Sequence, residues 1–175
     1  MRDLVLHDDT LLGEDIHTAQ IFGGIRYETD SSRSTPGFLP ATLREMRWLD
    51  SLLRAHSIQV DTFSGYNAYE GRIKRYCTDT LRSPHLLHIG THGYYFRASE
   101  KKNSSDEPGL KWADNPMFRS YLLMAGGLNT HLGKMPLRGF EDGLLSAYEI
   151  ASLNLTGTHL VVLSACQSGL GDLVG

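Results

Sequence analysis

The chain has no long hydrophobic run, no block of like charges and only two cysteines in its 175 residues. Its longest apolar stretches fall far short of a bilayer span, and the N-terminus lacks the apolar segment of a signal peptide. The formal net charge of −3 offers no electrostatic footprint for nucleic acid or an anionic membrane. We therefore expect a cytoplasmic globular domain that acts on small molecules or peptides, with Cys77 and Cys166 as free thiols.

Several catalytic signatures are also absent. No arginine or lysine follows Cys166, whereas a cysteine phosphatase needs an arginine in the loop after its cysteine. The pair Gly169 and Gly171 lacks the Gly-Lys-Ser/Thr ending of a phosphate-binding P-loop, and the chain has no Gly-x-Ser-x-Gly elbow of a serine hydrolase. These absences argue against phosphatase, P-loop and serine hydrolase chemistry.

Hydrophobic periodicity predicts strands and helices that alternate along the chain. A helix over residues 40–56 is the clearest element, because four apolar residues follow one another at three- and four-residue steps: Leu43, Met46, Leu49 and Leu53. Capping-box patterns, Asn67 with Glu70 and Ser146 with Glu149, predict two further helices, to about residues 80 and 153. Strands are predicted at 19–27, 58–63, 86–89, 121–125 and 160–163, and a polar, mobile loop at about 97–116. This order favours an α/β fold with a mostly parallel sheet flanked by helices.

Two predicted strand ends carry the residue types of a cysteine hydrolase. The apolar run at 160–163 leads into Cys166, which we expect at the tip of a buried strand, and the strand at 86–89 breaks at a glycine beside His92. The carboxyl ends of parallel strands lie along one edge of a sheet, where such folds gather ligands. A neighbouring imidazole promotes the reactive thiolate, and the amides of Gly93 and Cys166 could hydrogen-bond an oxyanion. The sequence therefore predicts a His92–Cys166 dyad.

Other interpretations of these residues remain open. Cys166 could be a small buried hydrophobe and His92 a turn histidine, but the small neighbours of Cys166 favour an exposed nucleophile. Cys77 lies in a helical segment and is predicted to be structural. His88 and His92 would lie about 13 Å apart on a strand, which argues against a shared metal, so we predict neither a metal nor a cofactor and place His88 in the core. The remaining histidines are predicted in loops or on solvated faces: His7, His17, His56, His131 and His159.

The segments around the dyad resemble the two signatures of the CHAT domain, a caspase-like domain often found behind tetratricopeptide repeats. They read Leu87-His88-Ile89-Gly90-Thr91-His92-Gly93 and Val161-Val162-Leu163-Ser164-Ala165-Cys166-Gln167-Ser168-Gly169-Leu170-Gly171. Residues 141–150, and Leu39-Pro40-Ala41-Thr42 with Glu45, are also similar to family segments. The resemblance covers roughly residues 20–172 and implies a caspase-haemoglobinase-like fold for a single domain over residues 1–175.

The resemblance further implies cysteine endopeptidase activity on a protein or peptide substrate. His92 matches the position of the family's catalytic histidine and Cys166 that of its nucleophile, with no third residue required. A tetratricopeptide-repeat region in the full-length protein, and regulation by a region outside this chain, are also implied. Against the family pattern the chain starts late and stops soon after Cys166, so we expect a C-terminally truncated, partial domain with an exposed sheet edge and an incomplete primary specificity pocket, whose isolated chain could be inactive.

Two alternative functions differ in class from a peptidase. The first is a catalytically inactive caspase-like scaffold in a larger repeat protein, and the second is a metal-dependent or other hydrolase that uses His88 and His92. Cleavage preference does not follow from the sequence, because the nearby charges Arg138, Glu141 and Asp142 are typical of solvated loops.

Overall fold

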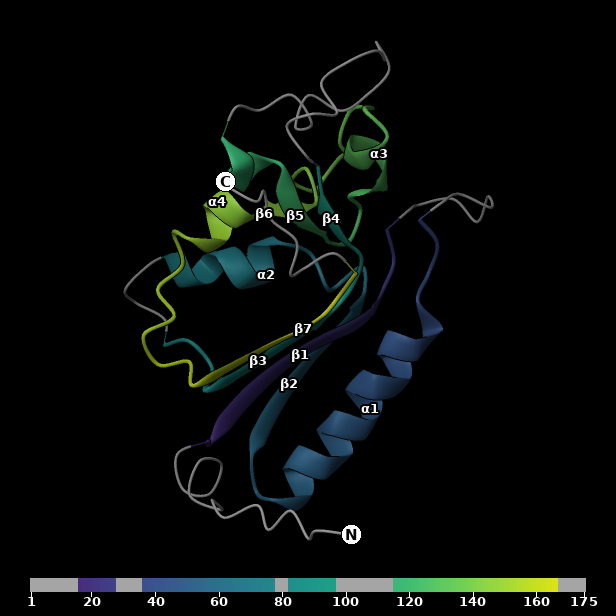
Figure 1. Cartoon of the computed structure of the whole chain (residues 1–175). Coiled ribbons are helices and arrows are strands. Elements are labelled where there is room, and N and C mark those ends of the chain that lie inside the picture. The colour runs from purple at the N-terminus through teal and green to yellow at the C-terminus, as the bar shows by residue number, and fades with distance from the viewer. Residues whose placement is uncertain (1–15, 28–35, 78–81, 97–114, 167–175) are drawn as a thin grey trace, which may run out of the picture.

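The computed structural model of the chain describes residues 16–27, 36–77, 82–96 and 115–166, which form two sheets (Figure 1). The main sheet is parallel, in the order β2-β1-β3-β7. The smaller sheet is antiparallel, in the order β4-β5-β6. The strand bounds are β1 Thr18–Ile25, β2 Gln59–Gly65, β3 Leu86–Gly90, β4 Gly93–Tyr95, β5 Ser120–Leu123, β6 Leu144–Ser146 and β7 Leu160–Ser164. The predicted α/β fold with a mostly parallel sheet is confirmed.

Helix α1 (Pro40–Ala55) covers one face of the main sheet (Figure 1). Proline at its first position suits a helix start, because the missing N–H would have no intrahelical partner there. Met46 is buried against β1, β2 and β3, and the other apolar residues of the predicted stripe pack around the same cluster: Leu43, Leu49 and Leu53. The helix predicted over 40–56 is therefore confirmed.

The opposite face of the main sheet carries the larger core, which joins it to the smaller sheet. Helix α2 (Gly71–Lys74) continues into the 3₁₀ helix η1 (Arg75–Cys77) on this side (Figure 1). Fully buried members of this core come from both sheets and from α2: Phe22, Ile25, Ile73, Leu123, Leu144 and Leu145. The packing of the two sheets on one core fixes the position of β4, which follows directly after His92.

Several predicted boundaries differ from the structure. The second helix begins at Gly71 rather than Asn67, because the side chain of Glu70 turns into the core, 1 % exposed, and forms no cap. The capping box of Ser146 and Glu149 is confirmed, but its helix α4 (Ala147–Ile150) ends earlier than expected. Some short elements were not predicted from the sequence: strands β4 and β6, helix α3 (Leu128–His131) and the 3₁₀ helix η4 (Pro116–Phe118). Of the predicted polar loop, residues 97–114 lie outside the described residues.

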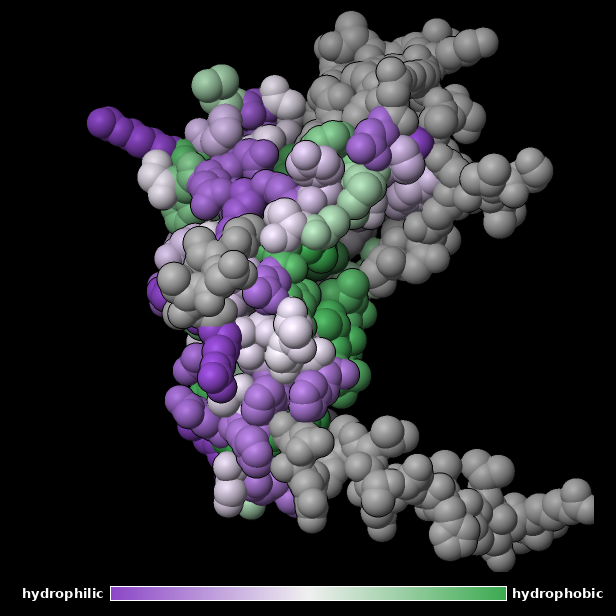
Figure 2. Space-filling model, turned by 90° about the vertical axis from the view of Figure 1, so that its left-hand side faces the viewer, coloured by the Kyte–Doolittle hydropathy of each residue, from purple (hydrophilic) through white to green (hydrophobic). Residues whose placement is uncertain are grey.

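Strand β7 corrects one prediction. The sequence indicated a buried strand, but among the described residues β7 pairs only with β3 and forms an edge of the main sheet. Its four apolar side chains are 36–45 % exposed: Leu160, Val161, Val162 and Leu163. Figure 2 shows strongly hydrophobic residues reaching the surface on one side of the molecule. A continuous apolar run is typical of a strand buried between neighbours, whereas within the described part of the chain β7 has a neighbouring strand on one side only.

Candidate active site

The ends of β3 and β7 bring the two predicted catalytic segments together. Gly90 and Ser164 are register partners in the parallel pair, and the Thr91 N–H donates a hydrogen bond to the Ser164 carbonyl oxygen over 3.2 Å. His92 lies two residues after Gly90, and Cys166 lies two residues after Ser164. The two residues therefore follow their paired strands at the same distance in sequence.

Glycine 93 lies directly against the cysteine segment. A Cβ atom at Gly93 would overlap the carbonyl oxygen of Cys166 and lie 3.3 Å from the Ala165 side chain. The absence of a side chain therefore lets the two backbones approach. The sequence predicts an oxyanion role for the amide of this glycine, and the structure adds this close backbone approach.

The ring of His92 is half-buried and held by a backbone carbonyl. Its Nε2 lies 2.8 Å from the carbonyl oxygen of Gly37, just before α1. A carbonyl accepts but never donates, so Nε2 carries the proton and the neutral ring keeps its lone pair on Nδ1. The rings of Tyr27 and Tyr94 flank the imidazole, with centroids 5.1 and 6.4 Å away. Sequence reasoning missed Gly37, because a backbone carbonyl leaves no side-chain signal.

Cys166 is an exposed free thiol at the end of the described chain segment. Burial raises the pKa of the Tyr94 hydroxyl to about 12, with further upward contributions from the charges of Tyr27 and Cys166. Cys166 is thus within electrostatic reach of Tyr94, whose ring also neighbours His92.

The Gly93 amide points away from the strand that pairs with it. In the β4–β5 ladder, the Leu123 N–H donates to the His92 carbonyl and the Phe96 N–H donates to the Arg119 carbonyl. Hydrogen-bonded and non-hydrogen-bonded pairs alternate in an antiparallel ladder, which makes the pair of Gly93 and Leu122 a non-hydrogen-bonded one. The Gly93 N–H is consequently directed outward from the ladder, as an oxyanion donor would need to be.

Thr91 holds the turn between β3 and β4 in place through buried hydrogen bonds. Its buried hydroxyl donates to the Leu123 carbonyl and lies 3.0 Å from the Tyr27 hydroxyl. Burial raises the pKa of Tyr27, while hydrogen bonds with Thr91 and with the His92 backbone act in the opposite direction. The neutral Tyr27 hydroxyl thus donates to Thr91 and holds the backbone that carries His92.

A carboxylate on α1 ties the two strand ends to the helix. One oxygen of Glu45 lies 3.2 Å from His88 Nε2, and the other accepts a hydrogen bond from the Ser164 hydroxyl over 3.0 Å. His88 is buried in the core, as the sequence indicated. Glu45 therefore links β3 to β7, at residues that precede His92 and Cys166 in the sequence.

An apolar cavity of about 270 Å³ opens beside Gly93. Its walls come from β4, β5, α4 and the last part of β7, and include Tyr94, Tyr121, Leu122, Ile150 and Leu163. The charged residues considered as specificity determinants, Arg138, Glu141 and Asp142, do not line it. This volume exceeds the 150 Å³ or so of a cavity that admits benzene, so one large apolar side chain would fit.

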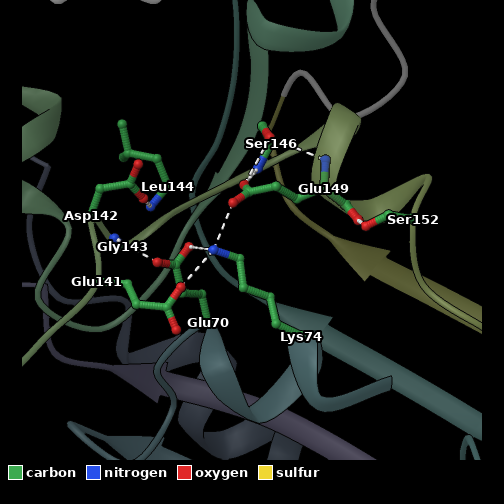
Figure 3. A network of polar contacts seen from close by, with 9 residues as sticks. All are labelled: Glu70, Lys74, Glu141, Asp142, Gly143, Leu144, Ser146, Glu149 and Ser152. Carbon is green, nitrogen blue, oxygen red and sulfur yellow. Dashed lines mark hydrogen bonds and ion pairs between the residues drawn. The ribbon is translucent and has the colours of Figure 1, made fainter. Parts of the chain in front are cut away.

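A network of charges links α2 to the segment that forms the wall of this cavity (Figure 3). The Lys74 amine lies 2.6 Å from Glu141, 2.6 Å from Glu149 and 3.5 Å from the buried Glu70. Burial alone would lower the pKa of Lys74, but hydrogen bonds to Glu141 and Glu149 outweigh it and raise that pKa. Lys74 therefore fixes the capping carboxylate of α4, and with it the base of the cavity.

Most of the described histidines contact other side chains, and these contacts differ in kind. His131 was expected on a solvated face, but its Nδ1 lies 2.8 Å from the Tyr121 hydroxyl and its ring packs 4.3 Å from that of Tyr94. His17 and His159 are exposed, as expected, and both contact His85. Within the described residues, no group of three or more histidine, cysteine or acidic side chains could hold a metal ion.

Comparison with known families matches residues 4–175 to the CHAT domain, a wider range than the resemblance at 20–172. No protein of curated function and no solved structure matches the chain. Among the described residues, no helix is both long and apolar enough to cross a membrane.

Proposed function

Because the chain belongs to the CHAT domain family, a family of caspase-like peptidases, we propose that it is a cysteine endopeptidase domain that uses Cys166 and His92. The observation that carries this proposal is the alignment of the two strand ends. Register partners Gly90 and Ser164 lead in two steps to His92 and Cys166, and Gly93 packs against the Cys166 backbone. The site then acts within the full-length protein, under control of a region outside this chain.

In the first chemical step, His92 Nδ1 takes the proton from Cys166 Sγ. The thiolate attacks the carbonyl carbon of the peptide bond, and a carbon–sulfur bond forms while the carbonyl oxygen becomes an oxyanion. The amides of Gly93 and Cys166 donate hydrogen bonds to that oxyanion. Gly37 supports this role of His92, since its carbonyl holds the proton on Nε2 and leaves Nδ1 as the base.

In the second step, His92 gives its proton to the leaving nitrogen, and the carbon–nitrogen bond breaks. The acyl group remains on Cys166 as a thioester. Water then attacks the thioester, His92 accepts a proton from the water, and that proton returns to the sulfur as the carboxylic acid leaves. Atoms balance without an oxidant, metal or cofactor.

The accessibility of the two side chains supports catalysis over an inert scaffold. A structural pair would be expected to be fully buried, whereas Cys166 is exposed and His92 only half-buried. The apolar cavity beside Gly93 further supports a peptide substrate that places an uncharged, apolar side chain close to the scissile bond.

The test is covalent labelling of the chain with a peptide acyloxymethyl ketone that carries a leucine next to the reactive carbon, followed by intact mass. We expect one label at Cys166, none in Cys166→Ser, and a rate about 10²-fold lower in His92→Ala, because general-base catalysis contributes roughly that factor. Equal labelling of His92→Ala and the parent would disprove the dyad.

Two matched controls make the result specific. Cys77→Ser removes the other cysteine and should label at the parental rate. His56→Ala removes an exposed histidine at the end of α1 and should also have no effect. A probe with aspartate in place of leucine should react more slowly, and faster reaction would refute the role of the apolar cavity.

A further inference from the structure

We propose that Lys74 of α2 is a positioning residue that sets which substrate side chains the apolar cavity beside Gly93 accepts. Lys74 does not line the cavity, and it acts through Glu149 on helix α4, which forms one wall. With this wall in place, the cavity takes a branched apolar side chain such as leucine and holds alanine less tightly. This role rests on the proposed peptidase function and names the part of the chain that sets its substrate preference.

Helix α4 is held in place only partly by apolar packing. It supplies Ala147 and Ile150 to the cavity, and Ala151 follows at its end. A helix of four residues is too short to be stable by its own hydrogen bonds, and none of the four is buried. Its apolar contacts are those of Ile150 at the margin of the core and of Tyr148, whose ring stacks on Phe118. The position of this wall therefore depends on polar contacts as well.

Glu149 joins α4 to Lys74 through its two carboxylate oxygens. Oε2 accepts hydrogen bonds from the Ser146 N–H over 2.9 Å and from the Ser146 hydroxyl over 2.8 Å, within the capping box. Oε1 lies 2.6 Å from the Lys74 amine. Burial alone would raise the pKa of Glu149, but hydrogen bonds from Lys74 and Ser146 outweigh it and lower that pKa. Glu149 is therefore ionised, and its side chain ties the start of α4 to α2.

Lys74 can hold this wall because α2 is anchored in the core. Its neighbour Ile73 is 1 % exposed and packs in the larger core. Glu70, one turn earlier, is also buried and accepts a hydrogen bond from the Gly143 N–H over 3.3 Å. The stem of the Lys74 side chain thus starts from a fixed point, and its amine transfers that position to α4.

The Lys74 amine lies between carboxylates of like charge, as Figure 3 shows. Glu141 and Glu149 each lie 2.6 Å from it, so it holds the segment before β6 close to α4. Burial and the charge of Asp142 raise the pKa of Glu70 to about 8, so Glu70 is mostly protonated at neutral pH. Removal of the amine would leave Glu141 and Glu149 as neighbouring like charges, and the present position of α4 would no longer be favoured.

The reacting groups of the proposed dyad have separate supports. The Gly37 carbonyl holds the His92 ring, and Thr91 holds the turn before it. The strand that leads to Cys166 pairs with β3. A displaced α4 would therefore change the space for the substrate side chain and leave the chemistry intact. We expect the effect on the binding of a large side chain rather than on the rate of bond formation.

The test compares two peptide acyloxymethyl ketones that differ only in leucine or alanine next to the reactive carbon. The limiting rate and the half-saturating concentration of Cys166 labelling are both measured. In the parent, the leucine probe should label at least about tenfold faster at low concentration, because one methylene group in an apolar pocket is worth about 10–200-fold. In Lys74→Met, half-saturation by the leucine probe should need about tenfold more probe at an unchanged limiting rate. Parental labelling by the alanine probe would show that this variant is folded.

Two further variants show whether Lys74 acts through Glu149. Glu149→Gln keeps a side chain that suits the capping box but removes its charge, so it should raise the half-saturating concentration of the leucine probe in the same way. The double variant should be no worse than the worse single variant, because both remove one contact. Asp50→Asn removes the ion pair with Arg54 on α1 and should label like the parent. An unchanged leucine preference in Lys74→Met, an equal loss for both probes, or additive losses in the double variant would overturn the proposal.

A second measurement separates this role from the peptidase function. Cys166→Ser removes the thiol, and binding of N-acetylleucinamide to this variant can be followed by NMR of the methyl groups of Ala147 and Ala151. We expect Lys74→Met in this background to weaken the binding by about tenfold, and N-acetylalaninamide to bind less tightly than the leucine compound. If the parent is not labelled at all, the peptidase proposal fails, and this binding result decides the role of Lys74. No binding, or equal binding with and without the lysine, would overturn that role.

Discussion

A single methyl group at Gly93 tests the geometry of the candidate active site more sharply than removal of either proposed catalytic side chain. In Gly93→Ala the new Cβ would overlap the carbonyl oxygen of Cys166 and approach the Ala165 side chain to 3.3 Å. The backbone angles of Gly93 are outside the left-handed region, so alanine is strained by this contact alone. Both His92 and Cys166 keep their side chains in the variant.

The magnitude follows from the overlap. A carbon and a carbonyl oxygen rest comfortably at about 3.3–3.6 Å, so the Cys166 backbone would have to move by roughly 1 Å. A misplacement of about 1 Å in a site that depends on alignment costs about 10²-fold in rate. The same overpacking should cost about 1–3 kcal/mol in the free energy of unfolding.

The assay is the rate of Cys166 labelling by the peptide acyloxymethyl ketone, measured beside thermal unfolding of the same samples. Gly157→Ala is the matched control, because its Cβ would meet only the Ser83 side chain at 3.3 Å and the Ser83 carbonyl at 3.6 Å. We expect slow labelling in a folded Gly93→Ala chain and parental labelling in Gly157→Ala. Parental labelling of folded Gly93→Ala would refute the argument that this contact aligns the nucleophile.

Two further substitutions probe the support of the site. Burial raises the pKa of Glu70 from 4.5 to about 8, the charge of Asp142 adds to this and Lys74 opposes it. The folded chain therefore holds a proton that the unfolded chain releases, and this stabilisation is complete below pH 4.5 and is lost as the pH rises through 8. Glu70→Gln should reduce this fall in the free energy of unfolding, measured in urea titrations from pH 5 to 8. The fall is on the order of 3 kcal/mol at 1.36 kcal/mol per pKa unit. An unchanged dependence of the free energy of unfolding on pH would contradict the assignment. Thr91→Val removes the hydroxyl between Tyr27 and the Leu123 carbonyl, so it should cost about 1–3 kcal/mol in urea unfolding and slow Cys166 labelling; wild-type stability would show that these bonds are not needed.

The sequence predicts those parts of the fold that are decided by the pattern of side chains alone. The stripe from Leu43 to Leu53 predicts α1 because one face of that helix is buried, and the apolar runs predict the strands of the main sheet. Strands β4 and β6 have three residues each, too few for a period to appear, and β4 begins with a glycine. The start of α2 was predicted wrongly because the side chain of Glu70 contacts Lys74 and Gly143 instead of capping the helix.

The candidate site divides in the same way. His92, Gly93 and Cys166 could be proposed from the sequence because their side chains, or the lack of one, mark strand ends. The partner of the imidazole could not, because Gly37 contributes a backbone oxygen from a segment 55 positions away. The cavity beside Gly93 likewise depends on β5, α4 and β7 meeting in space.

The exposed edge strand has a kinetic consequence for Cys166, the proposed nucleophile. Strand β7 joins β3 across 74 positions of sequence, from Leu86 to Leu160, and non-local pairings of this kind form late in folding. An edge strand with exposed side chains also opens more readily than the core strands, and hydrogen exchange would record this as faster amide exchange in β7 than in β1. The core can therefore persist while the end of β7 that leads to Cys166 separates from β3, and the proposed labelling of Cys166 would depend on how long β7 stays paired.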